Sequence, residues 1–143
     1  MDQCSGWFGH LAGSVETGFL PDPERWHLWN DVLALLDLAA KRGGCEAWED
    51  GDLLWIAIEG TRLIGAATTR LLADGRAELK HVAGVKSRAW RGQLEAQICD
   101  WARGHGCPVI IARGRHGWAP IVEKLGWSRV GSEVGLTLYE KVL

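Results

Sequence analysis

Apolar and polar residues along this chain follow two periods, one typical of strands and one typical of helices. Between residues 53 and 85, apolar runs are separated by Glu59-Gly60-Thr61 and by Asp74-Gly75, and both are tight-turn signals. This spacing predicts three antiparallel strands joined by hairpins, with Gly65 marking a bulge inside the second. The strands predicted for the whole chain are residues 53–58, 62–71, 76–85, 108–112, 127–130 and 134–142.

Helices are predicted where apolar residues recur at intervals of three and four. The first begins with Asp22 as N-cap and Pro23 in its first turn, both of which are favoured at those positions. The last ends at Gly126, a residue type that readily takes the left-handed conformation of a helix end. The predicted helices are residues 23–42, 89–103 and 119–125.

The order of these elements predicts an α/β fold. Three antiparallel strands lie between two helices, and a further strand, helix and strand pair follow, which gives a mixed, mostly antiparallel sheet flanked by helices. Residues 1–20 are glycine-rich and form either a loose arm or a poor first strand. Residues 21–143 are then predicted to be a single domain, since this length is enough for one hydrophobic core.

Two detailed packing predictions follow from the periodicity. In the second helix, Trp90, Leu94, Ile98 and Trp101 fall on one face and are expected to lie against the sheet, with Arg91 and Glu95 facing outward. In the C-terminal strand pair, Trp127 is expected to be buried. Strand alternation there separates the set Val134, Leu136, Leu138 and Glu140 from the set Gly135, Thr137, Tyr139 and Lys141.

Composition and charge narrow the classes of function. Hydrophobic residues make up 47% and charged residues 24% of the chain, which is ordinary for a soluble globular protein. The formal net charge of −2 argues against a general nucleic-acid coat. No apolar run reaches the roughly 20 residues that a membrane span needs, and the first residues lack the features of a signal peptide. We therefore expect a cytoplasmic protein with no membrane partner.

The cysteines and tryptophans suggest structural roles. Cys4, Cys45, Cys99 and Cys107 form no Cys-x-x-Cys pair, so no metal site is expected and buried free thiols are predicted. Nine tryptophans are unusual for this length. We interpret most of them as anchors of a core or of an interface with a partner.

Several short stretches resemble the GNAT superfamily, the acyl-CoA-dependent N-acyltransferases. Val122-Glu123-Lys124-Leu125-Gly126-Trp127 resembles the last conserved block of that family, and residues 58–67 resemble its first meander hairpin. The resemblance covers about residues 53–143. Residues 101–107 and 114–118 also look like small GNAT-like proteins of phages and prophages, which would place the protein in a host cytoplasm or a virion.

The resemblance implies that acetyl-CoA binds between the strands of residues 76–85 and 108–112 and that the acyl acceptor is an amine. The family's phosphate-binding motif best matches residues 91–96, with Leu94 standing where a glycine is usual. The basic residues beside this motif form either part of a phosphate site or a solvated turn. The residues expected to bind the co-substrate are Val82, Gly84, Lys86, Ser87, Arg88, Arg91 and Gly92.

Candidate catalytic residues lie on the strand of residues 76–85. GNAT enzymes often use a glutamate on this strand as general base, and here the candidates are Glu78 and His81. Because they are three positions apart, a regular strand would point them to opposite faces. A histidine titrates near neutral pH, which suits a base, but a lone strand histidine also commonly has a structural role.

The general acid of the family is usually a tyrosine, and Val122 stands in its place. The single tyrosine, Tyr139, lies on the last predicted strand, where acting as the acid would require an unusual geometry. Arg113, Arg115 and His116 follow the strand of residues 108–112, at a strand end where ligands commonly bind. They are candidates for substrate binding, with helix capping and solvation as the alternative.

Two functions remain open from the sequence. The first is an N-acyltransferase that moves an acetyl group from acetyl-CoA to an amine. The second is a catalytically inactive GNAT-fold protein of a phage, which would bind a phage partner or a second copy of itself through tryptophan-rich surfaces. Modification of DNA bases is a third function, for which the chain offers no basic groove.

Overall fold

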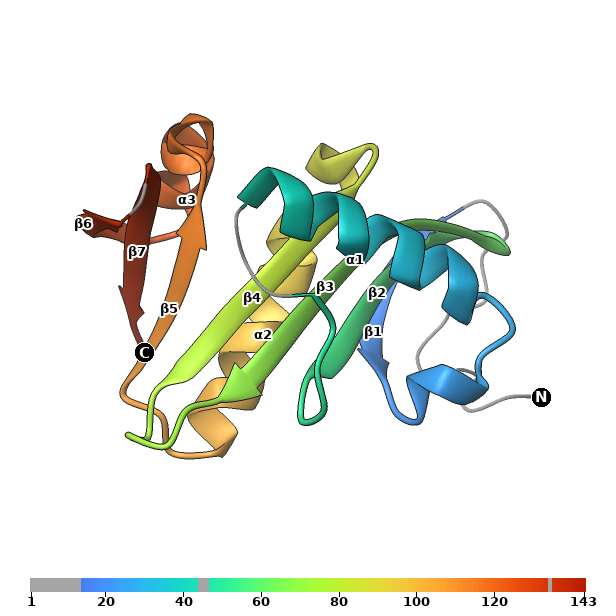
Figure 1. Cartoon of the computed structure of the whole chain (residues 1–143), viewed down its shortest axis with the longest axis horizontal. Helices are drawn as coiled ribbons and strands as arrows, with labels where there is room; N and C mark the ends of the chain where they lie inside the picture. Colours follow the sequence, from blue (N-terminus) through green and yellow to red (C-terminus); the bar gives the residue numbers. More distant parts are fainter. Residues whose placement is uncertain (1–13, 44–46, 134) are drawn as a thin grey trace.

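The computed structural model describes residues 14–43, 47–133 and 135–143, and it contains a seven-stranded sheet with helices on both faces (Figure 1). The strand order is β1-β2-β3-β4-β5-β7-β6, and all neighbours are antiparallel except β4 and β5. The predicted α/β architecture is therefore confirmed. The strands are β1 Val15–Leu20, β2 Leu53–Glu59, β3 Arg62–Leu71, β4 Ala77–Gly84, β5 Val109–Gly114, β6 Ser128–Glu133 and β7 Leu136–Val142.

The predicted three-strand meander forms β2, β3 and β4. Hairpin turns at Gly60 and Gly75, both with positive φ, join these strands. Of the two alternatives for residues 1–20, the structure contains the strand, because β1 pairs antiparallel with β2 over its whole length. Residues 1–13 lie outside the described residues.

The predicted first helix is broken near its start. Pro23–Arg25 forms only a 3-10 turn, and the α-helix α1 spans Trp29–Gly43. Asp22 does not cap with its side chain and instead has a left-handed backbone, with φ 48°. Trp26 is extended and 8% exposed, packed under α1. The prediction of one continuous helix was wrong because burying this indole requires a turn between the two segments.

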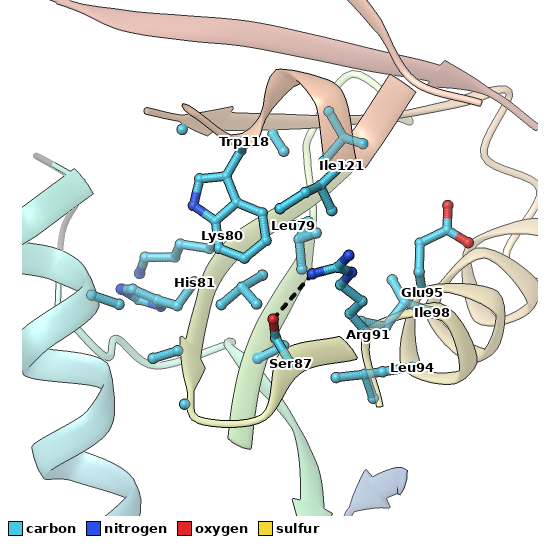
Figure 2. A pocket seen from close by; sticks show the side chains of 18 of the residues that line it. Leu79, Lys80, His81, Ser87, Arg91, Leu94, Glu95, Ile98, Trp118 and Ile121 are labelled. Atoms are coloured by element: carbon cyan, nitrogen blue, oxygen red, sulfur yellow. Dashed lines mark hydrogen bonds between the residues drawn. The ribbon is translucent and has the colours of Figure 1, made fainter. Parts of the chain in front are cut away.

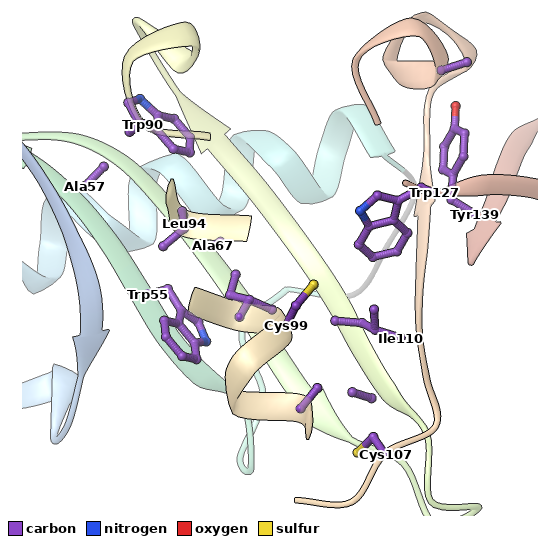
Figure 3. Close-up of a cluster of buried hydrophobic side chains, with 14 of the residues drawn as sticks. Trp55, Ala57, Ala67, Trp90, Leu94, Cys99, Cys107, Ile110, Trp127 and Tyr139 are labelled. Atoms are coloured by element: carbon purple, nitrogen blue, oxygen red, sulfur yellow. The ribbon is translucent and has the colours of Figure 1, made fainter. Parts of the chain in front are cut away.

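Two apolar clusters lie on opposite faces of the sheet. On the face that α1 covers, called the α1 face, Val32 and Leu36 pack against Leu54, Ile56 and Ala66. The opposite face carries α2, Arg91–Gly104, and is called the α2 face (Figure 1). Its cluster is the larger one and includes Trp55, Ala67, Trp90, Leu94, Ile98, Cys99, Ile110, Trp127 and Tyr139 (Figure 3).

The sheet-facing positions of α2 are as predicted. Trp90, Leu94 and Ile98 are each at most 2% exposed, and Trp101 is half-buried against the same cluster. A 3-10 turn at Ser87–Ala89 precedes the helix, which begins two residues later than expected.

The C-terminal part follows the predicted order of a short helix and two paired strands. The predicted strand bounds were wrong, because β6 continues through residues 131–133 to Glu133 and β7 begins only at Leu136. The short helix α3, Ala119–Lys124, ends at Gly126, whose φ is 95°. Trp127 is 3% exposed, and β6 pairs antiparallel with β7. Thr137 and Tyr139 are buried, while Leu136 and Leu138 on the other side of β7 are half-buried, as strand alternation requires.

The tryptophans serve mainly the interior of the molecule. Each of the eight in the described residues is buried or half-buried, and the indole of Trp55 donates to Thr69 Oγ1 at 3.0 Å. The proposal of a partner bound through a tryptophan-rich surface therefore has no support in this structure.

No helix in the described part of the chain is long and apolar enough to cross a membrane.

Candidate active site at the split between β4 and β5

The two parallel strands of the sheet separate after three residue pairs. Residues 77–79 of β4 pair with residues 110–112 of β5, and the strands then diverge (Figure 1). β4 continues to Gly84 and β5 to Gly114 without pairing to each other. These are the two strands between which the sequence resemblance places acetyl-CoA. Their separation leaves one edge of β4 with backbone groups that no strand neighbour takes up.

A cavity of about 500 Å³ lies at this split. Its walls come from both half-sheets and from all three helices, with leucines of α1 on one side and the first turns of α2 and α3 on the other. Figure 2 shows Trp118 and Ile121 above the cavity, with Lys80 and His81 on β4 and Arg91 on α2 around it. Seven of the predicted site residues line it: His81, Val82, Gly84, Ser87, Arg91, Arg113 and Arg115.

A β-bulge decides which side chains of β4 share a face. Thr68 pairs with His81 and Thr69 pairs with Leu79, so Lys80 is the extra residue. The Glu78 carboxylate accepts from Arg70, and His81 hydrogen-bonds Thr68, two positions before Arg70 on β3. Glu78 and His81 therefore both lie on the α1 face. The prediction of opposite faces was wrong because the bulge shifts the alternation by one residue.

His81 is held deep in this wall. It is 2% exposed, and its Nδ1 hydrogen-bonds the hydroxyl of Thr68, which is itself fully buried. Figure 2 shows the imidazole beside Lys80, on the side of β4 that faces α1. A buried hydrogen bond of this kind fixes the orientation of the imidazole ring. His81 is therefore pre-organised at the cavity.

Glu78 is engaged elsewhere. Its side chain is 6% exposed, its Oε1 accepts from Arg70 at 2.7 Å, and its Oε2 accepts from Arg113 at 2.9 Å. Arg113 also donates to Glu133 on β6 at 3.0 Å. Glu78 does not line the cavity. It joins β4 to β5 where they part, and guanidinium groups occupy both of its carboxylate oxygens.

Lys80 is a site residue that sequence analysis missed. Its side chain is 3% exposed, and its Nζ donates to the backbone oxygen of Ala47 and to the carboxylates of Glu49 and Asp52. Burial disfavours the ammonium, but the hydrogen bonds to Asp52 and Glu49 outweigh it and raise the pKa of Lys80. The lysine thus fixes residues 47–52 against the bulge. The sequence does contain a signal that could have identified Lys80, namely a lysine in the middle of a strand with many apolar residues.

The wall formed by the loop from β4 to α2 is closely packed. Trp90 donates its indole N–H to the carbonyl of Val85 at 2.8 Å. A Cβ on Gly65 would lie 2.5 Å from the Trp90 ring, and one on Gly84, whose φ is 143°, would lie 2.2 Å from the carbonyl oxygen of Ile64. Both glycines are therefore required for this loop to fold back against β3.

The basic residues of that loop separate into two groups. The guanidinium of Arg91 donates to the Ser87 hydroxyl at 3.2 Å and lies inside the cavity (Figure 2). Lys86 pairs with Glu59 at 2.8 Å, outside the cavity lining. Arg88 and Gly92 are exposed beside the start of α2. A Cβ added to Gly92 would meet nothing within 4 Å, so the first turn of this helix is open to a ligand.

The two polar side chains predicted to face outward on α2 lie inside. Arg91 lines the cavity, as described above. Glu95 is 12% exposed and accepts from the Trp127 indole at 2.9 Å and from Lys141 at 2.6 Å. The prediction failed because β7, which supplies Lys141, reaches the side of α2 that lies outside the predicted apolar stripe. Glu95 thereby joins α2 to the C-terminal half-sheet.

The wall formed by α3 offers few proton donors. Trp118, Ile121, Val122 and Leu125 line the cavity from this side. The hydroxyl of Tyr139, on β7, lies in the lining and donates to the carbonyl of Arg115 at 3.1 Å. Val122 thus takes the place at the cavity that the resemblance assigns to a catalytic tyrosine.

The remaining predicted residues lie at the end of β5. Arg113 and Arg115 are exposed and line the cavity, while His116 is exposed and does not line it.

Cys99 and Cys107 are buried free thiols as predicted, whereas Cys4 and Cys45 lie outside the described residues. Burial raises the pKa of Cys99 to about 11, so this thiol stays protonated near neutral pH. The described residues contain no cluster of histidine, cysteine and carboxylate side chains that could hold a metal.

Comparison with known proteins identifies the architecture. No protein-family model matches the sequence, and no curated protein matches it. Among solved structures, the chain is similar to the PaiA N-acetyltransferase of Thermoplasma acidophilum in complex with coenzyme A (12% identity, 91% of this chain and 99% of that one, TM-score 0.71). It is also similar to the IAA acetyltransferase of Bacillus cereus (15% identity, 91% of this chain and 100% of that one, TM-score 0.67).

A GNAT family acetyltransferase of Elizabethkingia anophelis with acetyl-CoA bound is similar too, at 14% identity over 91% of this chain and 99% of that one, with a TM-score of 0.66. These similarities do not support the narrower resemblance to phage proteins. They agree with the sequence resemblance over the meander, the split and the C-terminal strands. The chain therefore has the fold of the GNAT acetyltransferases.

Proposed function

We propose that this protein is an acyl-CoA-dependent N-acyltransferase that transfers an acetyl group to an amine at the split between β4 and β5. The observation that carries the proposal is the cavity at the split, with the oriented His81 in one wall and the open start of α2 in another. Structural relatives of the same fold were solved with CoA or acetyl-CoA bound.

The start of α2 suits the pyrophosphate of CoA. The first-turn N–H groups of a helix lack partners within the helix and carry the positive end of its dipole. Leu94 does not obstruct them, because its side chain is turned into the core and is 2% exposed. Gly92 is open, and the exposed Arg88 lies in the turn that precedes the helix, after Lys86, which pairs with Glu59. The unusual leucine in the motif is therefore compatible with phosphate binding.

His81 is the proposed general base. Its imidazole takes a proton from the acceptor amine, directly or through water, as the amine nitrogen attacks the thioester carbonyl carbon. Backbone N–H groups on the unpaired edge of β4 stabilise the oxyanion. The carbon–sulfur bond then breaks, and the amide and the free thiolate leave. Because Val122 has no proton to give, water protonates the thiolate, which slows transfer about 10²–10³-fold if general-acid catalysis has its usual size.

Binding and chemistry can be tested separately. We expect acetyl-CoA to bind with a Kd detectable by calorimetry and to raise the melting temperature. Gly92→Asp should weaken that binding at least about tenfold by repelling the phosphates, whereas Gly92→Ala should not. Both side chains meet open space, and an aspartate at this helix position does not harm folding. Equal binding by the two variants would contradict the proposed phosphate site.

The catalytic step is tested by release of free thiol from acetyl-CoA in the presence of amines. His81→Gln, which keeps a hydrogen-bonding group near Thr68, should lower turnover about 10²–10⁴-fold while acetyl-CoA still binds. Unchanged turnover would exclude His81 as base.

The second candidate, a GNAT-fold protein without catalysis, is favoured by one observation, the apolar wall that Val122 and its neighbours on α3 present to the cavity. Acetyl-CoA binding with no thiol release on any amine would select this candidate.

A further inference from the structure

The charges around the cavity restrict what kind of amine can enter. Among the described residues that line it, the basic side chains are Lys80, His81, Arg91, Arg113 and Arg115. Lys80 and Arg113 are each paired with two carboxylates that lie outside the lining. The only carboxylate in the same described lining is Glu95, and it lies on the α2 side, bound to Lys141 and Trp127. A polycationic amine needs carboxylates to replace its water, and this lining offers none for it.

The two arginines at the end of β5 lie on the face where His81 is. Gly114, between them, faces the other way, since a Cβ there would lie 3.6 Å from the ring of Tyr139, which belongs to the cluster on the α2 face. Arg113 is steadied by Glu78 and Glu133, at 2.9 and 3.0 Å. The backbone of Arg115 is fixed by the bond from Tyr139 to its carbonyl. The Arg115 guanidinium, on this fixed backbone, suits binding of a carboxylate. Arg113, whose Nε and Nη1 are already bound to Glu133 and Glu78, holds the neighbouring position on the same face.

The rest of this side is apolar. Leu35, Leu38 and Ala39 of α1 line the cavity, and Leu38 is 42% exposed. The ring of Trp118 projects over the cavity toward Lys80 and His81 (Figure 2). An acceptor that reaches His81 thus meets aliphatic and aromatic surface as well as the arginines.

We propose that the acceptor is a small amine that carries both a carboxylate and an apolar group, the chemistry of an apolar α-amino acid. This inference rests on the function proposed above and names the substrate class of the same site. The carboxylate lies at Arg115 and Arg113, the apolar group lies against Leu35, Leu38 and Trp118, and the amine is directed to His81. The acceptor is small because a cavity of about 500 Å³ must also receive the end of the acyl-CoA.

Three acceptors that differ in charge test the proposal: L-phenylalanine, L-phenylalaninamide and spermidine. The amide keeps the amine and the ring but replaces the carboxylate with an uncharged group. We expect kcat/KM to be about tenfold to a hundredfold higher for phenylalanine than for its amide, the usual effect of a lost charged hydrogen bond. We expect no transfer to spermidine. Equal rates for acid and amide, or a preference for spermidine, would overturn the proposal.

Arg115→Gln should raise KM for phenylalanine about tenfold or more and leave the weaker reaction of the amide unchanged, so that the preference disappears. Arg103→Gln, on the far end of α2 with Asp100 as its partner, is the matched control and should keep the preference. Retention of the preference by Arg115→Gln would exclude this arginine as the carboxylate site.

Calorimetry separates failure of this inference from failure of the proposed function. N-acetyl-phenylalanine, the expected product, should bind the protein more tightly than its amide, whether or not turnover is detected. If acetyl-CoA binds but neither phenylalanine nor this product does at millimolar concentration, the acceptor class is wrong and the acyltransferase proposal stands. If acetyl-CoA does not bind while the product does, the carboxylate site stands and the proposed function fails.

Discussion

The two walls of the cavity are built in different ways. On the α2 side, Trp90, Leu94 and Ile98 are at most 2% exposed. Gly65 and Gly84, which lie against this wall, leave no room for a side chain. On the α1 side, Leu38 is 42% exposed and Arg113 is 41% exposed. Close packing determines the structure of the α2 side, whereas ion pairs and one buried hydrogen bond determine much of the structure of the α1 side.

This difference indicates how each wall responds to mutation. A change on the α2 side alters close-packed core and is therefore expected to cost stability before it alters chemistry. A change on the α1 side alters charge or hydrogen bonding at the site, with a smaller cost in folding. The predictions below test this contrast, and a substitution at Val122 on α3 tests its limit, because there the side chain meets open cavity volume; they run from the largest expected effect to the smallest.

Leu94→Gly should produce the largest loss of stability. It removes a buried side chain from the α2 side and places a flexible residue inside a helix, which together cost about 3–5 kcal/mol. Chemical denaturation measures this change. Gly92→Ala, two residues earlier in open space, is the control and should shift stability by less than about 1 kcal/mol. A loss below 1 kcal/mol for Leu94→Gly would show that this wall tolerates substitution.

Val122→Tyr should raise acetyl transfer about 10²–10³-fold, equivalent to about 3–4 kcal/mol, if the new hydroxyl protonates the departing thiolate. Val122 lines the cavity and is half-buried, so a larger ring can extend into open volume. Val122→Phe adds the same ring without the hydroxyl and should leave the rate low. The comparison is made on kcat under saturating acetyl-CoA. Equal rates for the two variants would mean that proton donation does not limit this reaction.

Glu78→Gln should lower the free energy of unfolding by about 1–3 kcal/mol, because it removes the charge that binds Arg70 and Arg113 where β4 and β5 part. Glu133→Gln removes the other carboxylate on Arg113, but its side chain is 52% exposed. That loss should therefore stay below about 1 kcal/mol. If both variants lose the same amount, Glu78 has no special role at the split.

The smallest effect is a pH dependence at Lys80. The folded pKa of this lysine is raised above its reference value of 10.5, so the stability it contributes is complete below that pH and declines as pH rises through the folded value. Lys80→Arg keeps its charge over this range and should show a flatter curve of unfolding free energy against alkaline pH. Parallel curves for the two proteins would contradict the raised pKa.

The sequence by itself determined the elements that depend on local patterns. The alternation in β2 and β3, the turns at Gly60 and Gly75, and the apolar stripe of α2 are properties of neighbouring residues, and each was predicted within one or two positions. The stretch that ends at Gly126 likewise identified a short helix followed by a buried tryptophan. The resemblance to the GNAT superfamily, rather than these patterns, indicated the two strands between which the cavity lies.

Only the tertiary structure decided how the site is arranged. The bulge at Lys80 is a mismatch between two strands, and no periodicity of β4 alone reveals it, although it places His81 and Glu78 on one face. The bonds of Glu78 to Arg113 and of Glu95 to Lys141 join residues 35 and 46 positions apart. Side-chain orientation at such places depends on which segments meet across the fold, and that is settled when the sheet assembles, not by neighbours along the chain.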